Sequence, residues 1–220
     1  MEISNALIKH YLRNVLFING NSYAGKSTMA KMLADNYGLI HCGENYDCVP
    51  EGIIDPEKYP NLGYFQTMND WQEFINRTPE QYDNWIKNTS RELVEFEITY
   101  LISISGSQRV IVDTNIPVEV LREIADYDQV AIMLTHPSIS VENFFDRNDD
   151  KSLFLEHINK SNDPKKSMEN FLACMHKINH RQYYDEFNNT GFFTLERKDT
   201  QTDTRHETLE ILAQHFGFKT

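Results

Sequence analysis

The chain has 220 residues, with 40% hydrophobic and 25% charged side chains and a formal net charge of −12 at pH 7. This length and composition are typical of one globular domain, alone or with a sizeable insertion. The acidic balance argues against non-specific binding to nucleic acids or anionic membranes, because both need a basic surface. We expect a cytoplasmic protein, since no apolar run could span a membrane, no signal-peptide pattern is present and the three cysteines are few.

Five short, mostly apolar runs bounded by turn or polar residues predict strands. They lie at residues 15–18, 38–42, 109–113, 130–134 and 191–195. Helix patterns lie before, between and after these runs, at residues 2–13, 28–36, 78–104, 117–125, 141–145, 153–159, 167–187 and 203–216. Residues 44–78 are irregular and rich in aromatic side chains, and they are too many for a simple connection.

Apolar strands that alternate with helices predict a parallel sheet that is covered on both faces. We therefore expect an α/β fold of three layers, in which a five-stranded, mainly parallel sheet lies between helices. The whole chain, residues 1–220, is expected to form a single domain. In sheets of this kind, ligands bind beyond the carboxyl ends of the strands.

The segment between the first predicted strand and the next helix matches the phosphate-binding loop G-x-x-x-x-G-K-[ST] at every fixed position. The strand before it and the helix after it supply the context that this motif requires. The alternative is an ordinary turn between a strand and a helix. The expected nucleotide-binding residues are Gly20, Asn21, Ser22, Tyr23, Ala24, Gly25, Lys26, Ser27 and Thr28.

The residue types of this loop suit a nucleoside triphosphate with its metal ion. Gly20 and Gly25 allow the backbone to turn tightly and to approach a phosphate without a Cβ in the way. Backbone N–H groups and the positive end of the following helix attract an anion. Lys26 is expected to reach the β- and γ-phosphates of ATP, and the Ser27 hydroxyl is expected to bind Mg²⁺.

A strand that ends in a carboxylate offers a second ligand for Mg²⁺. Asp113 closes the third predicted strand, and a carboxylate there can hold the metal ion from the side opposite Ser27. Alternatively, Asp113 caps the segment that follows. Thr114 and Asn115 come next, so no second acid stands beside Asp113 to activate water, which counts against sustained ATP hydrolysis.

An arginine late in the chain could close over the transferred phosphate. Arg147 lies within residues 144–150, after a strand and a short helix, where an arginine can stabilise the charge on the transferring group. It could instead be a solvated residue that pairs with a neighbouring aspartate. Arg181 is a second candidate for the same role, or an ordinary residue of a helix surface.

Together, the loop, Asp113 and the late arginine resemble the small P-loop kinases, the superfamily of nucleoside, nucleotide, shikimate and gluconate kinases. The resemblance implies the P-loop NTPase fold and Mg²⁺-dependent transfer of the γ-phosphate of ATP to a small-molecule acceptor. It also implies an acid after the second strand that prepares the acceptor hydroxyl. Adenine in this superfamily lies against the loop after the last strand, where Arg197 is expected to stack on the base. The implied catalytic residues are Lys26, Arg147 and either Glu44 or Asp47.

The resemblance places the acceptor at residues 44–105 and a lid-like segment at residues 143–165. Arg77 or Arg91 could bind an acceptor phosphate, and aromatic side chains of this region could stack on a base or a sugar. The alternative for these aromatic side chains is an ordinary core. They include Tyr46, Tyr64, Phe65 and Trp71.

The sequence alone leaves other functions open. A nucleotide-dependent switch or an ATPase acting on a protein partner would share the loop, although the guanine-reading pattern N-K-x-D is absent. A third hypothesis is a degraded kinase that only binds nucleotide, which the intact Lys26 and Ser27 disfavour. His41, Cys42 and Cys48 lie close together in the sequence, but no second ligand pair follows, so we do not expect a zinc site.

Overall fold

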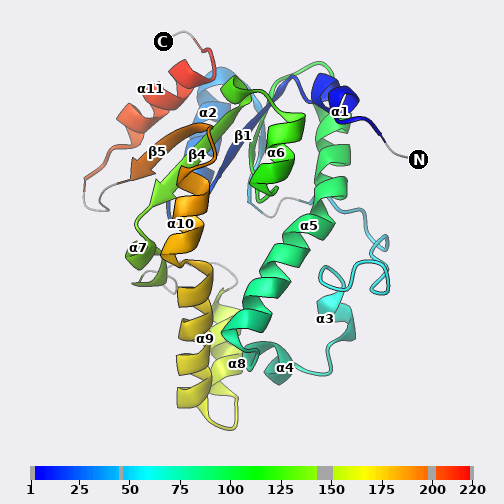
Figure 1. Ribbon diagram of the computed structural model, residues 1–220, viewed down its shortest axis with the longest axis vertical. Coiled ribbons are helices and arrows are strands. Elements are labelled where there is room, and N and C mark those ends of the chain that lie inside the picture. Colours follow the sequence, from blue (N-terminus) through cyan, green and yellow to red (C-terminus); the bar gives the residue numbers. More distant parts are fainter. Residues whose placement is uncertain (1–2, 45–46, 143–150, 198–201, 219–220) are drawn as a thin grey trace.

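The computed structural model describes residues 3–44, 47–142, 151–197 and 202–218, and it has a five-stranded sheet between layers of helices (Figure 1). The strands are β1 (Val15–Gly20), β2 (Ile40–Cys42), β3 (Val110–Asp113), β4 (Val130–Thr135) and β5 (Phe193–Arg197). Their order is β2-β3-β1-β4-β5, and every neighbouring pair is parallel. The predicted α/β class with a parallel sheet is confirmed.

The helices are α1 (Asn5–Tyr11), α2 (Lys26–Tyr37), α3 (Tyr64–Thr67), α4 (Trp71–Ile75), α5 (Pro79–Ile104), α6 (Val118–Ile124), α7 (Pro137–Glu142), α8 (Lys151–Asn159), α9 (Pro164–Ile178), α10 (Arg181–Asn188) and α11 (Arg205–His215), and a 3₁₀ turn lies at Tyr127–Gln129. One face of the sheet is covered by α2 and α11. The other face is covered by α1, α5, α6 and α10 (Figure 1). Every residue of β1, β3 and β4 is buried, which explains their continuous apolar sequence.

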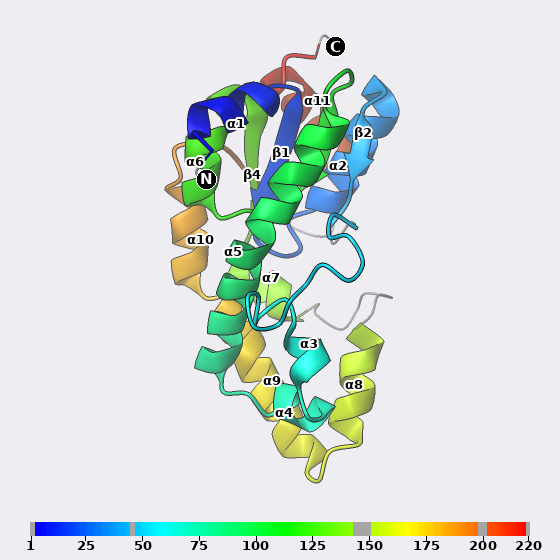
Figure 2. The ribbon, with the colours of Figure 1, turned by 90° about the vertical axis from the view of Figure 1, so that its right-hand side faces the viewer.

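A second group of helices lies beyond the carboxyl ends of the strands (Figures 1 and 2). This helical lobe consists of α3, α4, the first half of α5, α8 and α9, and it has a core of its own. The buried residues of that core are Phe74, Ile75, Tyr82, Ile158, Phe171, Cys174 and Met175. The lobe therefore draws on two segments that are far apart in the sequence, and it faces the edge of the sheet where the phosphate loop was predicted.

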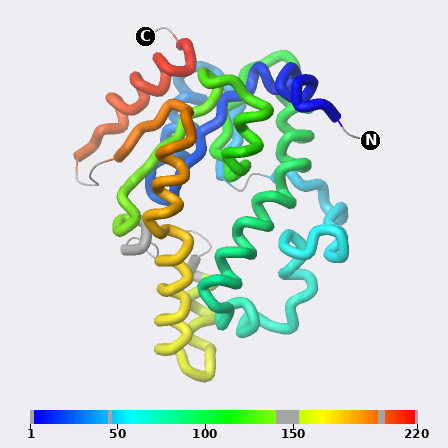
Figure 3. The backbone as a smooth tube through the Cα atoms, viewed as in Figure 1, coloured from blue at the N-terminus to red at the C-terminus, as the bar shows by residue number. Residues whose placement is uncertain are grey.

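The irregular chain before α3 lies along α5 (Figure 3). The Glu92 carboxylate on α5 accepts hydrogen bonds from the backbone N–H groups of Asn61 and Leu62 at 3.0 and 2.9 Å. The Trp85 indole N–H donates to the Asn61 carbonyl oxygen at 3.1 Å. These bonds satisfy backbone groups that no helix or strand pairs, so the connection has a defined path.

The helix predicted at residues 167–187 is wrong, because the structure has two helices there. α9 ends at Ile178 and α10 begins at Arg181, and the His180 ring nitrogen Nδ1 accepts from the Gln182 N–H at 3.2 Å as the cap of α10. α9 packs on α5 in the helical lobe, whereas α10 packs on the sheet. The chain has to turn between these two partners, and it does so within the four consecutive polar residues 179–182.

Other predicted boundaries shift by a few residues. α2 begins at Lys26 rather than at residue 28, and the irregular residues 44–78 contain the short helices α3 and α4. The helix predicted at residues 141–145 overlaps α7 at its start, and its remainder lies outside the described residues. Among the helices that the structure describes, none combines the length and the apolar character needed to cross a bilayer.

Candidate functional site

The loop between β1 and α2 has backbone angles that suit glycine. The angle φ is +132° at Gly20 and +92° at Gly25, in the region where a Cβ is strained. Gly20 also lies directly against β4, since a Cβ added there would meet the Met133 carbonyl oxygen at 1.9 Å. Tyr23 has a positive φ of +67° without being glycine. The two fixed glycines at these positions are therefore required by the path of the turn itself.

Two asparagines attach the loop to the neighbouring strands. Asn19 Nδ2 donates to the Ile116 carbonyl oxygen at 2.7 Å, and its Oδ1 accepts from the Gly20 N–H at 2.6 Å. Asn21 Nδ2 donates to the Thr135 carbonyl oxygen at 2.7 Å, and its Oδ1 accepts from the Thr135 N–H at 2.9 Å. The first residues of the loop are thus fixed to the chain that follows β3 and to the end of β4.

Lys26, Ser27 and Asp113 meet where the loop passes the end of β3. The Ser27 hydroxyl donates to Asp113 Oδ2 at 2.6 Å. Lys26 Nζ lies 3.9 Å from Asp113 Oδ1 and donates to the Asn21 carbonyl oxygen at 3.3 Å. The side chains of Lys26 and Asp113 are 7% and 1% exposed, so solvent screens their attraction only weakly. The parallel pairing that sets Ile18 opposite Asp113 brings these residues together.

The oxygen atoms at this meeting point are of the kind that Mg²⁺ prefers. A hydroxyl and a carboxylate are hard oxygen ligands, and Mg²⁺ is commonly held by one or two such groups together with phosphates and water. Ser27 and Asp113 are therefore the residue types that could hold a magnesium ion at this point. Within the described residues, no group of three or more His, Cys, Asp or Glu side chains could hold a metal ion.

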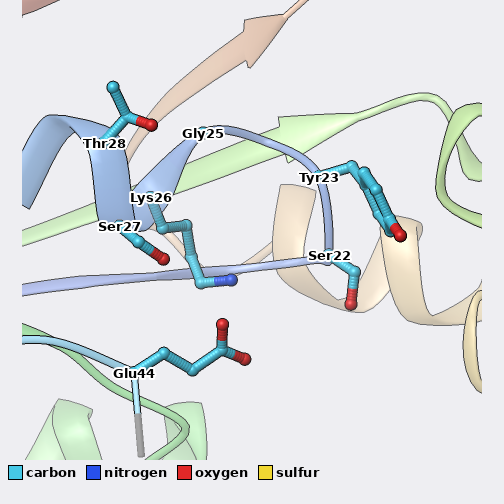
Figure 4. Close-up of a pocket in the computed structure, with 7 residues that line it drawn as sticks. All are labelled: Ser22, Tyr23, Gly25, Lys26, Ser27, Thr28 and Glu44. Atoms are coloured by element: carbon cyan, nitrogen blue, oxygen red, sulfur yellow. The ribbon is translucent and has the colours of Figure 1, made fainter. Parts of the chain in front are cut away.

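A pocket of about 240 Å³ opens over the loop. The residues that line it are Ser22, Tyr23, Gly25, Lys26, Ser27, Thr28 and Glu44. Figure 4 shows the Glu44 carboxylate pointing across the pocket toward the Lys26 amine. Asp47, the other predicted acid, is exposed and is not one of the lining residues. The turn after β2 thus brings Glu44, and not Asp47, to the wall opposite the loop.

Arg197 approaches the loop from the other edge of the sheet. It is the last residue of β5, and its Nη1 donates to the Tyr23 carbonyl oxygen at 3.5 Å. Because β2 and β5 are the two edge strands, Glu44 and Arg197 lie on opposite sides of the loop. Residues 198–201, which follow Arg197, lie outside the described residues.

Of the two arginines expected to close over the transferred phosphate, the structure describes Arg181. Arg147 lies outside the described residues. Arg181 is the first residue of α10, its side chain is 82% exposed, and its Nε lies 3.8 Å from Asp185 one turn later. Arg181 therefore has the setting of a residue on a helix surface, and it does not line the pocket.

Neither arginine of the predicted acceptor region lies at the pocket. The Arg77 guanidinium lies 3.7 Å from the centre of the Tyr64 ring in the helical lobe, close to Phe74 and Trp85. Arg91 is 61% exposed, and its Nη2 lies 3.9 Å from Glu119. The predicted stacking residues Tyr64, Phe65 and Trp71 pack on one another or on the lobe core, and Tyr46 lies outside the described residues.

The two cysteines near the end of β2 have the character of buried thiols. Burial, and next to it the negative charge of Glu97, raises the pKa of both Cys42 and Cys48 to about 11. Thiols with such a pKa are protonated at neutral pH and are therefore poor nucleophiles.

Asn19, Glu97 and Thr114 are buried polar residues at the site that were not predicted from the sequence. Thr114 donates from its hydroxyl to Glu97 Oε1 at 2.6 Å. The sequence carried one signal for this pair, because Glu97 occupies the same helix face as the apolar Val94 and Leu101. A charged residue on an apolar face indicates a buried partner, but the sequence does not say which one.

Comparisons with known proteins identify no family for this chain. No protein-family model matches it, and no curated protein matches it. Among solved structures, a crystal structure described as a "putative kinase" from Chloroflexus aurantiacus J-10-fl aligns with a TM-score of 0.44 and 12% identity, covering 91% of this chain and 97% of that chain. At this level of similarity, a function has to be argued from the site itself.

Proposed function

We propose that the protein is a Mg²⁺-dependent phosphotransferase that moves the γ-phosphate of ATP to a hydroxyl group of a small molecule. The observation that carries this proposal is a glycine-bounded loop where Lys26, Ser27 and Asp113 meet, with the Glu44 carboxylate across the same pocket. The loop and the start of α2 suit an anionic polyphosphate. A carboxylate on the facing wall suits the acceptor that would receive the phosphate.

On the donor side, the residues of the loop would bind and orient the triphosphate. Lys26 is a buried point charge that would offset the charge of the β- and γ-phosphates. Ser27 and Asp113 would hold Mg²⁺, which when bound neutralises phosphate charge and aligns the transferring group. Arg197, on the β5 side of the loop, would contact the base.

On the acceptor side, Glu44 would accept the proton of the attacking hydroxyl. The acceptor oxygen forms a bond to the γ-phosphorus while the bond from that phosphorus to the β,γ-bridging oxygen breaks, and ADP leaves. The proton passes to the Glu44 carboxylate, which lines the pocket opposite the loop. Arg147 stays a prediction from the resemblance, as a cation that stabilises the transferring group.

The charges around the pocket favour an acceptor without a phosphate group. Arg77 and Arg91, the expected phosphate-binding residues, contact Tyr64 and Glu119 instead. Two carboxylates lie here among the described residues: Glu44, which follows β2 and lines the pocket, and Asp113, which ends β3 and accepts from Ser27. An uncharged or positively charged hydroxyl compound suits this surface better than a nucleoside monophosphate does.

The first experiment measures whether Mg·ATP and an acceptor bind. At 100 times its dissociation constant, Mg·ATP is expected to stabilise the fold by about 2.7 kcal/mol, which raises Tm by roughly 5–10 °C in a chain of this size. Hydroxyl compounds that are uncharged, cationic or phosphorylated are then screened by ADP release. Acceptor-dependent release supports the transferase. Slow hydrolysis that no acceptor accelerates would favour the alternative, an ATPase or nucleotide-binding switch, and the absence of any thermal shift would overturn both.

The second experiment separates the two candidate acids. Glu44→Gln removes the proposed base and is expected to lower turnover by about 100-fold or more. Its affinity for Mg·ATP should stay the same or rise, because a negative charge opposite the phosphates is lost. Asp47→Asn is the matched control, and it should stay within about threefold of wild type because Asp47 is not at the pocket. The reverse pattern would identify Asp47 as the acid and show the assignment of Glu44 to be wrong.

A further inference from the structure

A path of hydrogen bonds leads from the middle of α5 to the first peptide of the loop. Glu97 Oε1 accepts from the Thr114 hydroxyl at 2.6 Å, and the oxygen of that hydroxyl accepts from the Ile116 N–H at 3.0 Å. The Ile116 carbonyl oxygen accepts from Asn19 Nδ2 at 2.7 Å, and Asn19 Oδ1 accepts from the Gly20 N–H at 2.6 Å. Four hydrogen bonds thus join a helix, the chain after β3 and the phosphate loop.

Water has almost no access to this path. Asn19, Glu97, Thr114 and Ile116 are each at most 3% exposed. Hydrogen bonds to a charged group in such an environment are stronger than those in water, and each missing partner is correspondingly costly. Glu97 also lies near the Cys42 thiol, whose pKa is raised first by burial and next by Glu97.

The path touches both parts of the proposed donor site. Thr114 follows Asp113 directly, and its backbone N–H donates to the Ile18 carbonyl oxygen at 3.0 Å. The Thr114 hydroxyl is held by Glu97, so the chain that carries the Asp113 carboxylate toward Ser27 has one orientation. At the other end, Asn19 fixes the N–H of Gly20, where the loop begins.

We propose that Glu97 is a positioning residue of the nucleotide site, which acts through Thr114 and Asn19 to hold the Asp113 carboxylate and the start of the loop in the arrangement that binds Mg·ATP. This inference rests on the proposed function. Substituting buried charged groups by apolar residues of similar volume often costs little stability or increases it. Stability alone therefore does not explain a carboxylate at position 97. The contacts of Glu97 with the chain beside Asp113 point to a role in the site instead.

The test compares variants that keep or remove the bridging hydroxyl. Thr114→Val keeps the shape of the side chain but loses the donor, and we expect its dissociation constant for Mg·ATP to rise about tenfold. Thr114→Ser restores the hydroxyl and should return within about threefold of wild type. Thr99→Val on the exposed face of α5 is the matched control and should bind as wild type.

A double variant separates positioning from stability. Glu97→Leu with Thr114→Val removes both members of the Thr114–Glu97 hydrogen bond. The Ile116 N–H loses its acceptor in both variants, so the double variant should be at least as stable as Thr114→Val alone, in which Glu97 is left without this donor. If Glu97 positions the site, the double variant folds and still binds Mg·ATP about tenfold more weakly, with a higher Mg²⁺ concentration needed for half-maximal binding. Binding equal to wild type by the folded double variant, or failure of Thr114→Ser to restore binding, would overturn the role of Glu97. Wild-type protein that binds no Mg·ATP would overturn the proposed function itself, and the positioning role with it.

Discussion

Replacing Lys26 with alanine is expected to weaken Mg·ATP binding by at least about 100-fold, which corresponds to about 2.7 kcal/mol. Lys26 is a buried cation at the base of the pocket, and the phosphates would lose the charge that offsets their own. Calorimetric titration with Mg·ATP measures the effect directly. Adenosine, which has no phosphate, serves as a second ligand whose binding should not depend on Lys26.

The matched control for this prediction is Lys31→Ala. Lys31 lies on the same helix, its side chain is 67% exposed, and it pairs with Asp35 one turn later. An exposed pair of this kind contributes little to stability, so this variant should bind and fold as wild type. Circular dichroism checks that Lys26→Ala is folded, because its loss removes the cation beside the buried Asp113. Unchanged Mg·ATP affinity in a folded Lys26→Ala protein would show that the loop does not bind the triphosphate.

The parts of the molecule that depend on nearby residues were predictable from the sequence. The loop from Gly20 to Ser27 lies between β1 and α2 as expected, because fixed spacing within one turn specifies it. The five apolar runs became the five strands, since burial on both faces requires continuous apolar sequence. Asp113 lies beside Ser27 because parallel neighbours bring their carboxyl ends to one edge.

The parts that depend on distant segments were not predictable in the same way. Glu44 and Asp47 are three residues apart, and only the path of the turn after β2 decides which one reaches the pocket. Arg77 and Arg91 both lie in the expected acceptor region, but Arg91 lies beside Glu119 and not at the pocket. Arg77 comes just before α5, and because a helix rises about 1.5 Å per residue, the first residues of α5 lie roughly 30 Å from those near Glu97. Side chains at that end of α5 belong to the helical lobe and not to the pocket.

The hydrogen bond between Thr114 and Glu97 could not be predicted either, because it also joins distant segments. Its members are 17 residues apart and belong to a helix and a strand end. The sequence shows an acid on an apolar helix face, which is a signal that was not used, but its partner is set by the sheet order. Since β3 lies between β2 and β1, the chain after β3 is the one that meets both α5 and the loop.

Replacing Gly20 with alanine is expected to destabilise the whole fold by more than about 4 kcal/mol, which is more than most single substitutions do. Two effects add at this position. The angle φ of +132° is strained for any side chain, and the added Cβ would lie 1.9 Å from the Met133 carbonyl oxygen, a backbone atom of the neighbouring strand. Relief requires β1 and β4 to separate at the centre of the sheet, where both strands are fully buried.

Two further glycines separate the strain from the collision. Gly38 has a φ of +64° with nothing within 4 Å of an added Cβ, so Gly38→Ala should cost only the left-handed strain of about 1–2 kcal/mol. Gly106 has neither a positive φ nor a close neighbour, and Gly106→Ala should change stability by less than about 1 kcal/mol. The free energy of unfolding in urea should therefore be far lower for Gly20→Ala than for Gly38→Ala, and lower for Gly38→Ala than for Gly106→Ala. If Gly20→Ala were no less stable than Gly38→Ala, the close approach of β1 to β4 at the start of the loop would be wrong, and with it the geometry from which the donor site is built.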